Sequence, residues 1–301
     1  FIPATIKPKK GFAPDTLGKN DRLRREIFAG SKKLSYLKTS NWHPDRLQAR
    51  GRFSTDLRTS SIAVIGAGAL GSAVAEILAR GGVTKMLIID SDDLEPGNLV
   101  RHTLIGSDLG RNKAIATAAR LNGAAPMSSI SAHSASLPSG SSLQKLLEPF
   151  DIVLDCTGED DVLRRLYDTW WAIPRYFLSA SFGFAAKRLI LFGVHACAFP
   201  YEEFVVAIKP WLDVERLEWS AAGETLEGAG CWSQLFPARC DDVWLGAIAT
   251  VKHLESIVQG AWQNDLRVLE QTLADGFVGY RVVELDQLCA DEKDADVTGV
   301  S

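Results

Sequence analysis

The stretch that decides the fold runs from Ser61 to Asp90 and reads SIAVIGAGALGSAVAEILARGGVTKMLIID. A short apolar run enters the glycine-rich segment Gly66-Ala-Gly-Ala-Leu-Gly71, a helical pattern follows over residues 72–80, and a second apolar run over residues 83–90 ends in an acid. Two apolar strands joined through a helix in this way form a βαβ unit. The stretch therefore predicts the start of a mainly parallel sheet.

The same alternation continues to about residue 160 and then changes. A helix, a strand, a helix and a strand are predicted at residues 111–122, 128–133, 141–148 and 151–155. Strand-like segments without crossover helices between them follow at residues 176–180, 186–197 and 204–209. We therefore expect a Rossmann-like, doubly wound α/β fold whose mainly parallel sheet is extended by antiparallel strands.

The rest of the chain gives the domain organisation. A loop is expected over residues 212–234, a long helix from Asp241 to about Ala274 with a break near Gly260, and a last strand near residues 278–284. Residues 1–58, rich in Lys, Arg, Pro and Ser, are interpreted as a connector or arm, and residues 59–301 as one domain. Its parts are a glycine-rich half, a sheet extension with a crossover loop, a helix with the last strand, and a tail, at residues 59–160, 161–240, 241–290 and 291–301.

Composition and charge exclude several classes of function. The 301 residues are 46% apolar and 23% charged with a formal net charge of −4, so nucleic acid is not an expected partner. No apolar stretch approaches the ~20 residues that span a bilayer, so we expect no membrane span. We also expect no signal peptide, because the first residues contain no long apolar run. Five cysteines without a C-x-x-C pair predict reduced thiols in the cytoplasm and no structural zinc site. The absence of an initiator methionine is consistent with a fragment of a longer chain.

Three glycines have the spacing of a phosphate-binding turn. Gly66, Gly68 and Gly71 permit a tight turn, close approach of the backbone to phosphate, and close packing of the following helix, whose N-terminal amides face the phosphate charge. Asp90, at the end of the next strand, can accept hydrogen bonds from ribose hydroxyls. These features predict a nucleotide site, although a nicotinamide-dependent oxidoreductase would satisfy them equally well. A glycine turn that serves only packing is the alternative without function.

The residues after this acid favour phosphate chemistry over hydride transfer. They read DSDDLEPGNLVRH over residues 90–102 and GRNK over residues 110–113. When a carboxylate attacks the α-phosphate of ATP, pyrophosphate leaves with charge building on its oxygens, and positioned Arg, Lys and Mg²⁺ stabilise that charge. Arg101 offers a bidentate fork, Lys113 a point charge, and Asn98 a neutral donor. A dehydrogenase needs none of these behind its ribose acid.

These residues resemble the ThiF/MoeB superfamily, which includes the ubiquitin-activating enzymes. The runs GAGALGS, IIDSDDLEPGNLVRH and GRNKA match its pattern of G-x-G-x-x-G, D-x-D, N-x-x-R and a later lysine, and the likeness covers roughly residues 61–255. The resemblance implies an ATP-dependent adenylyltransferase. In it Asp90, with Asp92 as the second acid of the D-x-D pattern, holds the ATP ribose. The phosphates are contacted by Asn98, Arg101 and Lys113.

The resemblance also implies a homodimer and a magnesium site. An arginine upstream of the first strand, Arg50 or Arg52, would reach the partner's site, although a solvated basic pair is the other interpretation. The family's D-x-T-D acid for Mg²⁺ is replaced, because Gly158 stands at its position. Either its role falls to one of three neighbouring acids, Asp155, Glu159 or Asp160, or the start of the following helix is shifted. Asp155 is the best placed of the three, at a strand end.

Many activating enzymes of this family pass the acyl group to a cysteine, which forms a thioester. Cys231, in the glycine-rich loop before the long helix, lies where the family's thioester cysteine falls. Cys240 is the rival, because Arg239 and a helix N-terminus can stabilise its thiolate. A chain without a catalytic cysteine is the third possibility.

Several features resemble bacterial activating enzymes fused to a ubiquitin-conjugating-like domain. They are WHPDRLQARG over residues 42–51, the NLVRH variant, and the GCWSQLFP loop, together with the lack of C-x-x-C pairs. Such fusions occur in CBASS antiviral operons, where the substrate is the C-terminus of a cGAS-like nucleotidyltransferase. A stand-alone activator of a ubiquitin-like protein is the other possibility. An NAD(P)-dependent oxidoreductase and a catalytically silent scaffold subunit of an activating enzyme are the alternatives from other classes.

Overall fold

The structure is a computed structural model, and it describes residues 51–221, 238–260, 265–274 and 276–285, together with Arg25, His43 and Arg46. At residues 219–221, 274 and 277 it describes the backbone only. The chain divides into two units, Phe1–Arg46 and Leu47–Ser301, and the sheet with its covering helices belongs to the second. The helices of the described residues include none that is both long and apolar enough to cross a membrane.

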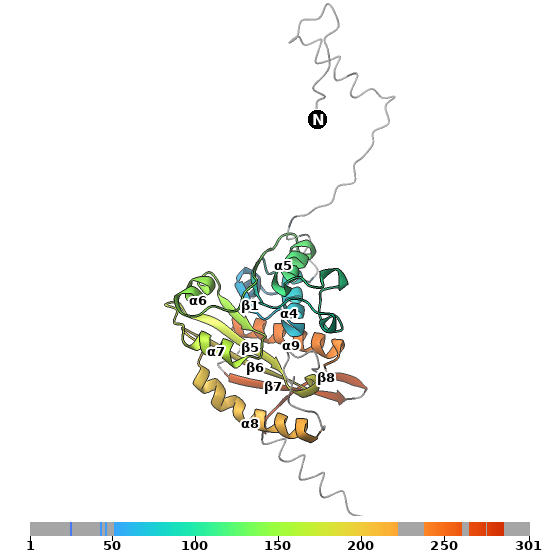
Figure 1. The fold of residues 1–301 in the computed structure, drawn as a ribbon, viewed down its shortest axis with the longest axis vertical. Helices are drawn as coiled ribbons and strands as arrows, with labels where there is room; N and C mark the ends of the chain where they lie inside the picture. The colour runs from blue at the N-terminus through green and yellow to red at the C-terminus, as the bar shows by residue number, and fades with distance from the viewer. Residues whose placement is uncertain are drawn as a thin grey trace, which may run out of the picture. The chain divides into compact units, whose positions relative to one another are not determined.

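The first part of this unit alternates strands and helices (Figure 1). Its elements are β1 (Ser61–Ile65), α4 (Ala69–Arg80), β2 (Lys85–Ile89), η1 (Pro96–Asn98), η2 (Gly106–Asp108), α5 (Lys113–Ala124), β3 (Ser129–His133), α6 (Gly140–Leu147), β4 (Ile152–Asp155), α7 (Asp160–Tyr167) and β5 (Arg175–Phe182). The predicted elements of this part are confirmed to within a few residues at their ends.

The second part begins with η3 (Phe184–Ala186) and β6 (Arg188–Ala196). It continues with α8 (Tyr201–Ala221), α9 (Cys240–Val258), β7 (Asp265–Ala274) and β8 (Phe277–Val283). A short helix, α3 (Thr55–Thr59), precedes β1 within the segment interpreted as an arm. Its Leu57 is fully buried in the core, and the Ser54 amide donates to Glu255 Oε1 of α9 at 2.6 Å.

The eight strands found in the described residues form one sheet in the order β3-β2-β1-β4-β5-β6-β7-β8. The strand pairs β1–β2, β1–β4, β2–β3 and β4–β5 are parallel. The pairs β5–β6, β6–β7 and β7–β8 are antiparallel. The predicted Rossmann-like fold with an antiparallel extension is therefore confirmed. The strand order reverses at β1, since β2 and β4 both pair with it. Ligands in open α/β sheets bind at such a switch point.

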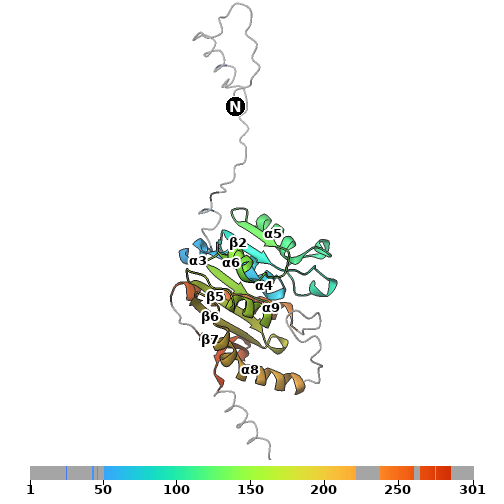
Figure 2. The same ribbon diagram turned by 60° about the vertical axis from the view of Figure 1, so that its left-hand side comes forward.

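Helices cover both faces of the sheet (Figure 2). Along β1 the side chains alternate, so that Ile62 and Val64 join one core cluster while Ala63 and Ile65 join the other. The first cluster holds residues of α3, α4, α5 and α9, and the second holds residues of α6, α7 and α8. The continuous apolar runs at the sheet centre follow from this burial on both faces.

Three predicted elements are wrong in whole or in part. The sequence predicts a strand at residues 204–209 and a loop at residues 212–234, but residues 201–221 are the helix α8. Residues 222–234 of the predicted loop lie outside the described residues. The run Phe204-Val-Val-Ala-Ile208 contains β-branched residues that favour strands, yet Phe204, Ile208 and Trp211 lie at helical spacing and pack together against the sheet. Tertiary packing therefore overrides the local preference.

The long helix predicted from Asp241 to Ala274 is the third error. It ends at Val258, and Gly260, at the predicted break, has a φ of +71° that right-handed helix cannot continue through. Residues 265–274 instead form β7, in which Val268 and Glu270 are buried at the two-residue spacing of a strand. The Leu, Arg, Glu and Gln residues of this strand have high helix propensity, which is why the sequence predicts a helix here.

Candidate functional site

A pocket opens at the carboxyl ends of β1, β2 and β4, at the switch point of the sheet. Of the predicted site residues, it brings together Gly66, Gly68, Asp90, Asp92, Asn98, Arg101 and Lys113. These residues come from the turn before α4, the end of β2, η1 and the start of α5. Segments far apart in the sequence thus meet at one site.

The three glycines divide their tasks. Gly66 has a φ of +86°, and a Cβ at Gly71 would lie 1.9 Å from the Gly66 carbonyl oxygen, so both serve the tight turn and its packing. A Cβ at Gly68 would meet nothing within 4 Å. Gly68 is also the N-cap of α4, and it has no side chain to cap the helix. This open space before a helix N-terminus fits an anionic phosphate group.

Asp90 fixes the turn from the neighbouring strand. Its Oδ2 accepts from the Ala67 amide at 2.7 Å, and its Oδ1 accepts from the Asp92 amide at 2.8 Å. Burial raises the pKa of Asp90, and these two backbone hydrogen bonds oppose the rise. In this arrangement the carboxylate supports the turn, and further lone pairs are available for ribose hydroxyls.

The cations of the site are held on two segments. Lys113 Nζ contacts Asp92 Oδ2 at 3.0 Å, and the Lys113 amide donates to the Asp92 carbonyl oxygen at 2.8 Å. Arg101 and Lys113 are 6% and 9% exposed, although both line the pocket. Asn98 Oδ1 accepts from the Glu95 amide at 3.0 Å, which fixes η1. Largely buried cations that face a pocket are suited to a polyanion, because little solvent screens them.

His102 also lines the pocket, and no sequence motif indicates its contact with the glycine turn. Its Nε2 lies 2.6 Å from the Ala67 carbonyl oxygen, and its Nδ1 accepts from the Leu104 amide at 3.0 Å. Since Nδ1 accepts, Nε2 carries the proton and donates it to Ala67. Burial lowers the pKa of His102 to about 4. The ring therefore stays neutral at physiological pH and ties the glycine turn to the segment that carries Arg101.

Replacing His102 by leucine should weaken ATP binding by up to about thirtyfold, because two hydrogen bonds of about 1 kcal/mol each would be lost, one to Ala67 in the glycine turn and one from the Leu104 amide. His102→Gln keeps one donor and one acceptor, and we expect it to bind ATP within about threefold of wild type. Titration calorimetry measures both, with His195→Leu on β6 as a control outside the pocket. Equal ATP affinity of the Gln and Leu variants would contradict this role.

The acids proposed for a metal lie in different places. Asp155 is 2% exposed; its Oδ1 accepts from the Thr157 amide and hydroxyl at 3.0 and 2.6 Å, and its Oδ2 accepts from Ser179 at 3.1 Å. Asp160 pairs with Arg164 at 2.6 Å and with the Tyr201 hydroxyl. Glu159 lines the pocket, and burial together with the charges of Asp92, Asp90 and Asp161 raises its pKa.

The burial of Asp155 predicts a specific pH dependence. Burial raises its pKa from 3.8 to about 6, so the folded state favours the protonated form more than the unfolded state does. The protonated Asp155 therefore contributes fully to the stability of the folded state at a pH below the pKa of the unfolded state. This contribution decreases as the pH rises through the pKa of the folded state, by about 3 kcal/mol at most. The unfolding free energy of wild type minus that of Asp155→Asn should fall between about pH 4 and about pH 6 and then level off. Urea titrations measure it, and a constant difference would contradict the burial effect.

The structure describes only some of the predicted nucleophilic cysteines and upstream arginines. Cys231 and Arg50 lie outside the described residues, whereas Arg52 is exposed. Cys240 is the first residue of α9 and is exposed, next to the Arg239–Asp241 ion pair of 2.7 Å. Cys156 is buried and lines the pocket. The described part of the chain contains no group of three His, Cys, Asp or Glu side chains arranged to hold a metal.

Comparison with known proteins agrees with this geometry. A model of the ThiF family matches residues 45–181. The ATP-dependent ubiquitin transferase-like protein Cap2 of Enterobacter hormaechei is 34% identical over 84% of this chain and 42% of its own length. The sulfur carrier protein adenylyltransferase of Thermus thermophilus is 33% identical over 34% of this chain and 37% of its own. The chain thus spans less than half the length of these two relatives.

Solved structures share the fold at low sequence identity. Crystalline MccB of E. coli with ATP has a TM-score of 0.51 at 13% identity, over 76% of this chain and 65% of that one. A crystal structure of PaaA has a TM-score of 0.53 at 16% identity, over 92% of this chain and 87% of that one. The family model and the Cap2 relative agree with the sheet order and with the residues gathered in the pocket. The chain therefore belongs to the ThiF family, in the ThiF/MoeB superfamily.

Proposed function

We propose that this chain adenylates the C-terminal carboxylate of a protein tail at the expense of ATP. The observation that carries the proposal is the pocket in which the glycine turn, Asp90, Arg101 and Lys113 meet. The adenylyltransferase named among the sequence relatives supports it. Those matches cover only part of each relative, so the activity of the longer proteins enters here as a proposal.

In this reaction a carboxylate oxygen attacks the α-phosphorus of ATP. The bond from that phosphorus to the bridging oxygen breaks, and pyrophosphate leaves with the electron pair. The open space at Gly68 and the amides of α4 receive a phosphate, while Asp90 accepts from the ribose. Arg101 and Lys113 stabilise the charge that grows on pyrophosphate. To do so, the Lys113 ammonium group, which contacts Asp92 Oδ2, would shift part of this contact to a phosphate oxygen.

Magnesium fits the acidic side of the pocket. Glu159 faces the charges of Asp92, Asp90 and Asp161, and a cation would relieve their mutual repulsion. When bound there, Mg²⁺ would neutralise part of the negative charge of the phosphates. Its strand-end position makes Asp155 the first candidate from the sequence, but both of its oxygens already accept hydrogen bonds from Thr157 and Ser179. We therefore propose Glu159 as the direct ligand, with Asp155 orienting the Thr157 turn.

The steps after adenylation follow the resemblance to activating enzymes. The acyl group would pass from AMP to Cys231, or to the exposed Cys240, as a thioester. A ubiquitin-conjugating-like domain or protein would accept it next. The tail would belong to a ubiquitin-like or a cGAS-like protein, and the similarity to Cap2 favours the latter, in a cytoplasmic CBASS antiviral system. A homodimer would let Arg50 or Arg52 act in the partner's site.

The test is a thermal melt with ATP·Mg²⁺, AMP, NAD⁺ and NADP⁺, on wild type and on Asp90→Ala. A ligand at ~100 times its Kd stabilises the folded state by roughly 2.7 kcal/mol, which raises Tm by about 5–10 °C. We expect this shift with ATP in wild type and its loss in Asp90→Ala. A shift with NAD⁺ or NADP⁺ alone would establish the oxidoreductase instead, and no shift with any nucleotide would establish the silent scaffold.

A further inference from the structure

A second cavity adjoins the nucleotide pocket, and we call it the α7–α8 groove. It lies between α7, the end of β5, η3 and α8, with a volume of about 540 Å³. Ligand pockets typically measure about 300–1,000 Å³. The groove shares Glu159 and Phe182 with the lining of the nucleotide pocket. A molecule seated in it therefore lies directly beside the bound nucleotide.

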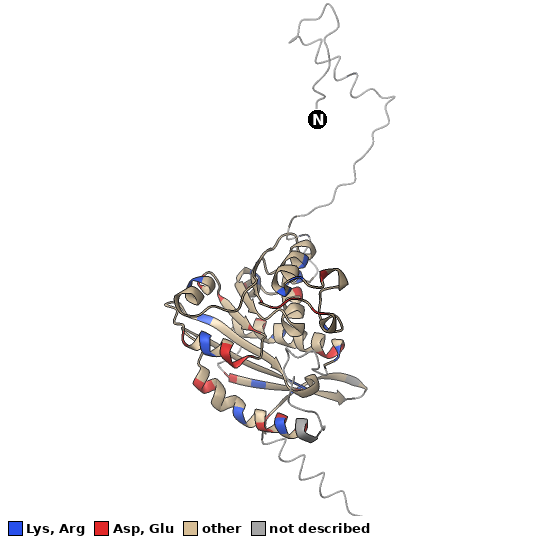
Figure 3. Ribbon diagram, in the orientation of Figure 1, with Lys and Arg blue, Asp and Glu red and all other residues tan. Residues whose placement is uncertain are grey.

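The lining of the groove is apolar at its base and polar at its rim. Buried side chains form the base, namely Leu163, Ile190, Phe204 and Ile208. Val205 and Leu212 are 37% and 39% exposed and face the same space. The charged residues of α7 and α8 that line the rim include Arg164, Lys209 and Arg216, and Figure 3 shows basic and acidic residues alternating along α8. An apolar base with a polar rim suits an apolar side chain carried on a polypeptide backbone.

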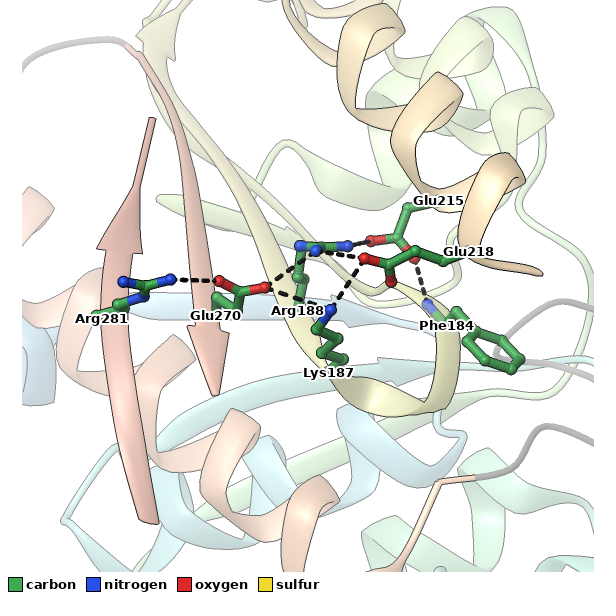
Figure 4. A network of polar contacts seen from close by, with 7 residues as sticks. All are labelled: Phe184, Lys187, Arg188, Glu215, Glu218, Glu270 and Arg281. Carbon is green, nitrogen blue, oxygen red and sulfur yellow. Dashed lines mark hydrogen bonds and ion pairs between the residues drawn. The ribbon is translucent and has the colours of Figure 1, made fainter. Parts of the chain in front are cut away.

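A buried network of ions fixes one wall of the groove (Figure 4). Arg188 is 1% exposed and contacts Glu215, Glu218 and Glu270 at 3.0, 2.7 and 2.9 Å. Glu215 Oε2 also accepts from the Phe184 amide at 2.5 Å. Since Phe184 and Glu215 both line the groove, the network joins α8 to η3 and to the sheet. Ion pairs and a backbone hydrogen bond therefore hold this wall of the groove in place.

The same wall contains strained backbone. Ala185 and Ala186 have φ values of 53° and 55°, the left-handed region that residues with a Cβ avoid. Two consecutive residues of this kind strain the backbone, and such strain gathers at ligand-binding sites. The hydrogen bond from Phe184 to Glu215 and the buried position of Ala186 hold the turn in place. Phe184, the residue before this turn, lines the groove.

We propose that the α7–α8 groove binds an apolar side chain of the carboxylate-bearing tail, a few residues before its C-terminus, and thereby selects the substrate. The tail's last residues would then continue past Glu159 and Phe182 to the nucleotide. This inference rests on the proposed adenylation, which requires a tail to reach the α-phosphate. It adds a requirement on the tail's sequence, since a tail without a large apolar residue leaves the apolar base unfilled.

A panel of peptides tests the proposal with the full chain. The peptides are about ten residues long, end in glycine with a free carboxylate, consist otherwise of alanine and serine, and carry one phenylalanine at varied positions. An N-terminal fluorophore reports binding by anisotropy in the presence of a nonhydrolysable ATP analogue, and pyrophosphate exchange into ATP reports the chemistry. Val205→Trp fills the groove, and Val206→Trp is the matched control, because Val206 is 75% exposed and outside the lining.

We expect one phenylalanine position to bind at least about tenfold tighter than the alanine–serine peptide, and Val205→Trp, but not Val206→Trp, to remove that preference. Equal binding of all peptides, no binding of any, or equal effects of the two tryptophan variants would overturn the inference. Binding that depends on the groove without any pyrophosphate exchange would leave the groove as a peptide site and refute the adenylation. The two proposals can therefore fail separately.

Discussion

Replacing Arg101 by methionine is expected to lower the rate of tail-dependent pyrophosphate release by about 10²–10³-fold. Arg101 is 6% exposed and lines the nucleotide pocket, so its charge acts on the leaving pyrophosphate with little screening by water. Loss of one such preorganised group typically costs about 3–4 kcal/mol of transition-state stabilisation. The rate is measured as pyrophosphate release at saturating ATP and peptide.

Arg111→Met is the matched control for this prediction. Arg111 lies on the same stretch of chain, pairs with Asp108 at 2.6 Å and is absent from the pocket lining. A thermal melt of each variant separates loss of chemistry from loss of folding. If Arg101→Met folds and retains a rate within about threefold of wild type, Arg101 does not stabilise the transition state.

Replacing Arg188 by methionine is expected to destabilise the folded chain by about 3–5 kcal/mol, or about 10 °C in Tm. The guanidinium is buried among Glu215, Glu218 and Glu270, and the first and last of these are 9% and 5% exposed. Removing the cation leaves buried carboxylates without a counter-charge. Urea denaturation measures the loss.

The control for this prediction is Arg281→Met, since Arg281 contacts the same Glu270 at 3.1 Å but is 51% exposed in its side chain. Exposed ion pairs contribute about 0–1 kcal/mol, so this variant should be close to wild type. Equal losses in the two variants would show that burial of Arg188 does not determine the cost. Adding Glu215→Gln to Arg188→Met should recover part of the stability, because one uncompensated charge is removed.

The parallel half of the fold can be predicted from the sequence because each of its central strands is buried on both faces. Ile62–Ile65 is apolar throughout for this reason, and the glycine turn that comes after it has a fixed conformation. The second half of the fold cannot be predicted in this way, because the conformations of α8 and β7 depend on packing against other elements. Phe204 and Ile208 suit a strand locally and become a helix face only against the sheet. The buried Glu270 of β7 pairs with the buried Arg188, eighty-two positions away, and no local pattern indicates that pairing.

The candidate site shows the same division. Residues with a local motif, such as Gly68, Asp90 and Lys113, are predicted from the sequence, and the structure places them in one pocket. His102 belongs to no motif that assigns it a role, and its contact with Ala67, thirty-five positions earlier, cannot be inferred from spacing. Glu159 and Asp155 are neighbours in sequence, yet only the fold shows that Asp155 turns into the core while Glu159 faces the nucleotide pocket.

The α7–α8 groove cannot be predicted at all, because it requires the helix that the sequence conceals. Its base combines Leu163 of α7, Ile190 of β6 and Phe204 of α8. These residues come from three elements with different periodicities, and no window of sequence contains them together. Sites assembled from distant elements have no local signature, so the structure is what reveals them.

Transfer of oxygen from the tail to AMP tests the adenylation most directly. The full chain is incubated with ATP·Mg²⁺ and the phenylalanine peptide whose terminal carboxylate is labelled with ¹⁸O, and hydroxylamine releases AMP from any acyl-adenylate. Because a carboxylate oxygen attacks the α-phosphorus, the account predicts AMP that carries one ¹⁸O atom, with none formed by Arg101→Met above about 1% of the wild-type rate. AMP without the label, or ADP as the product, would contradict the account.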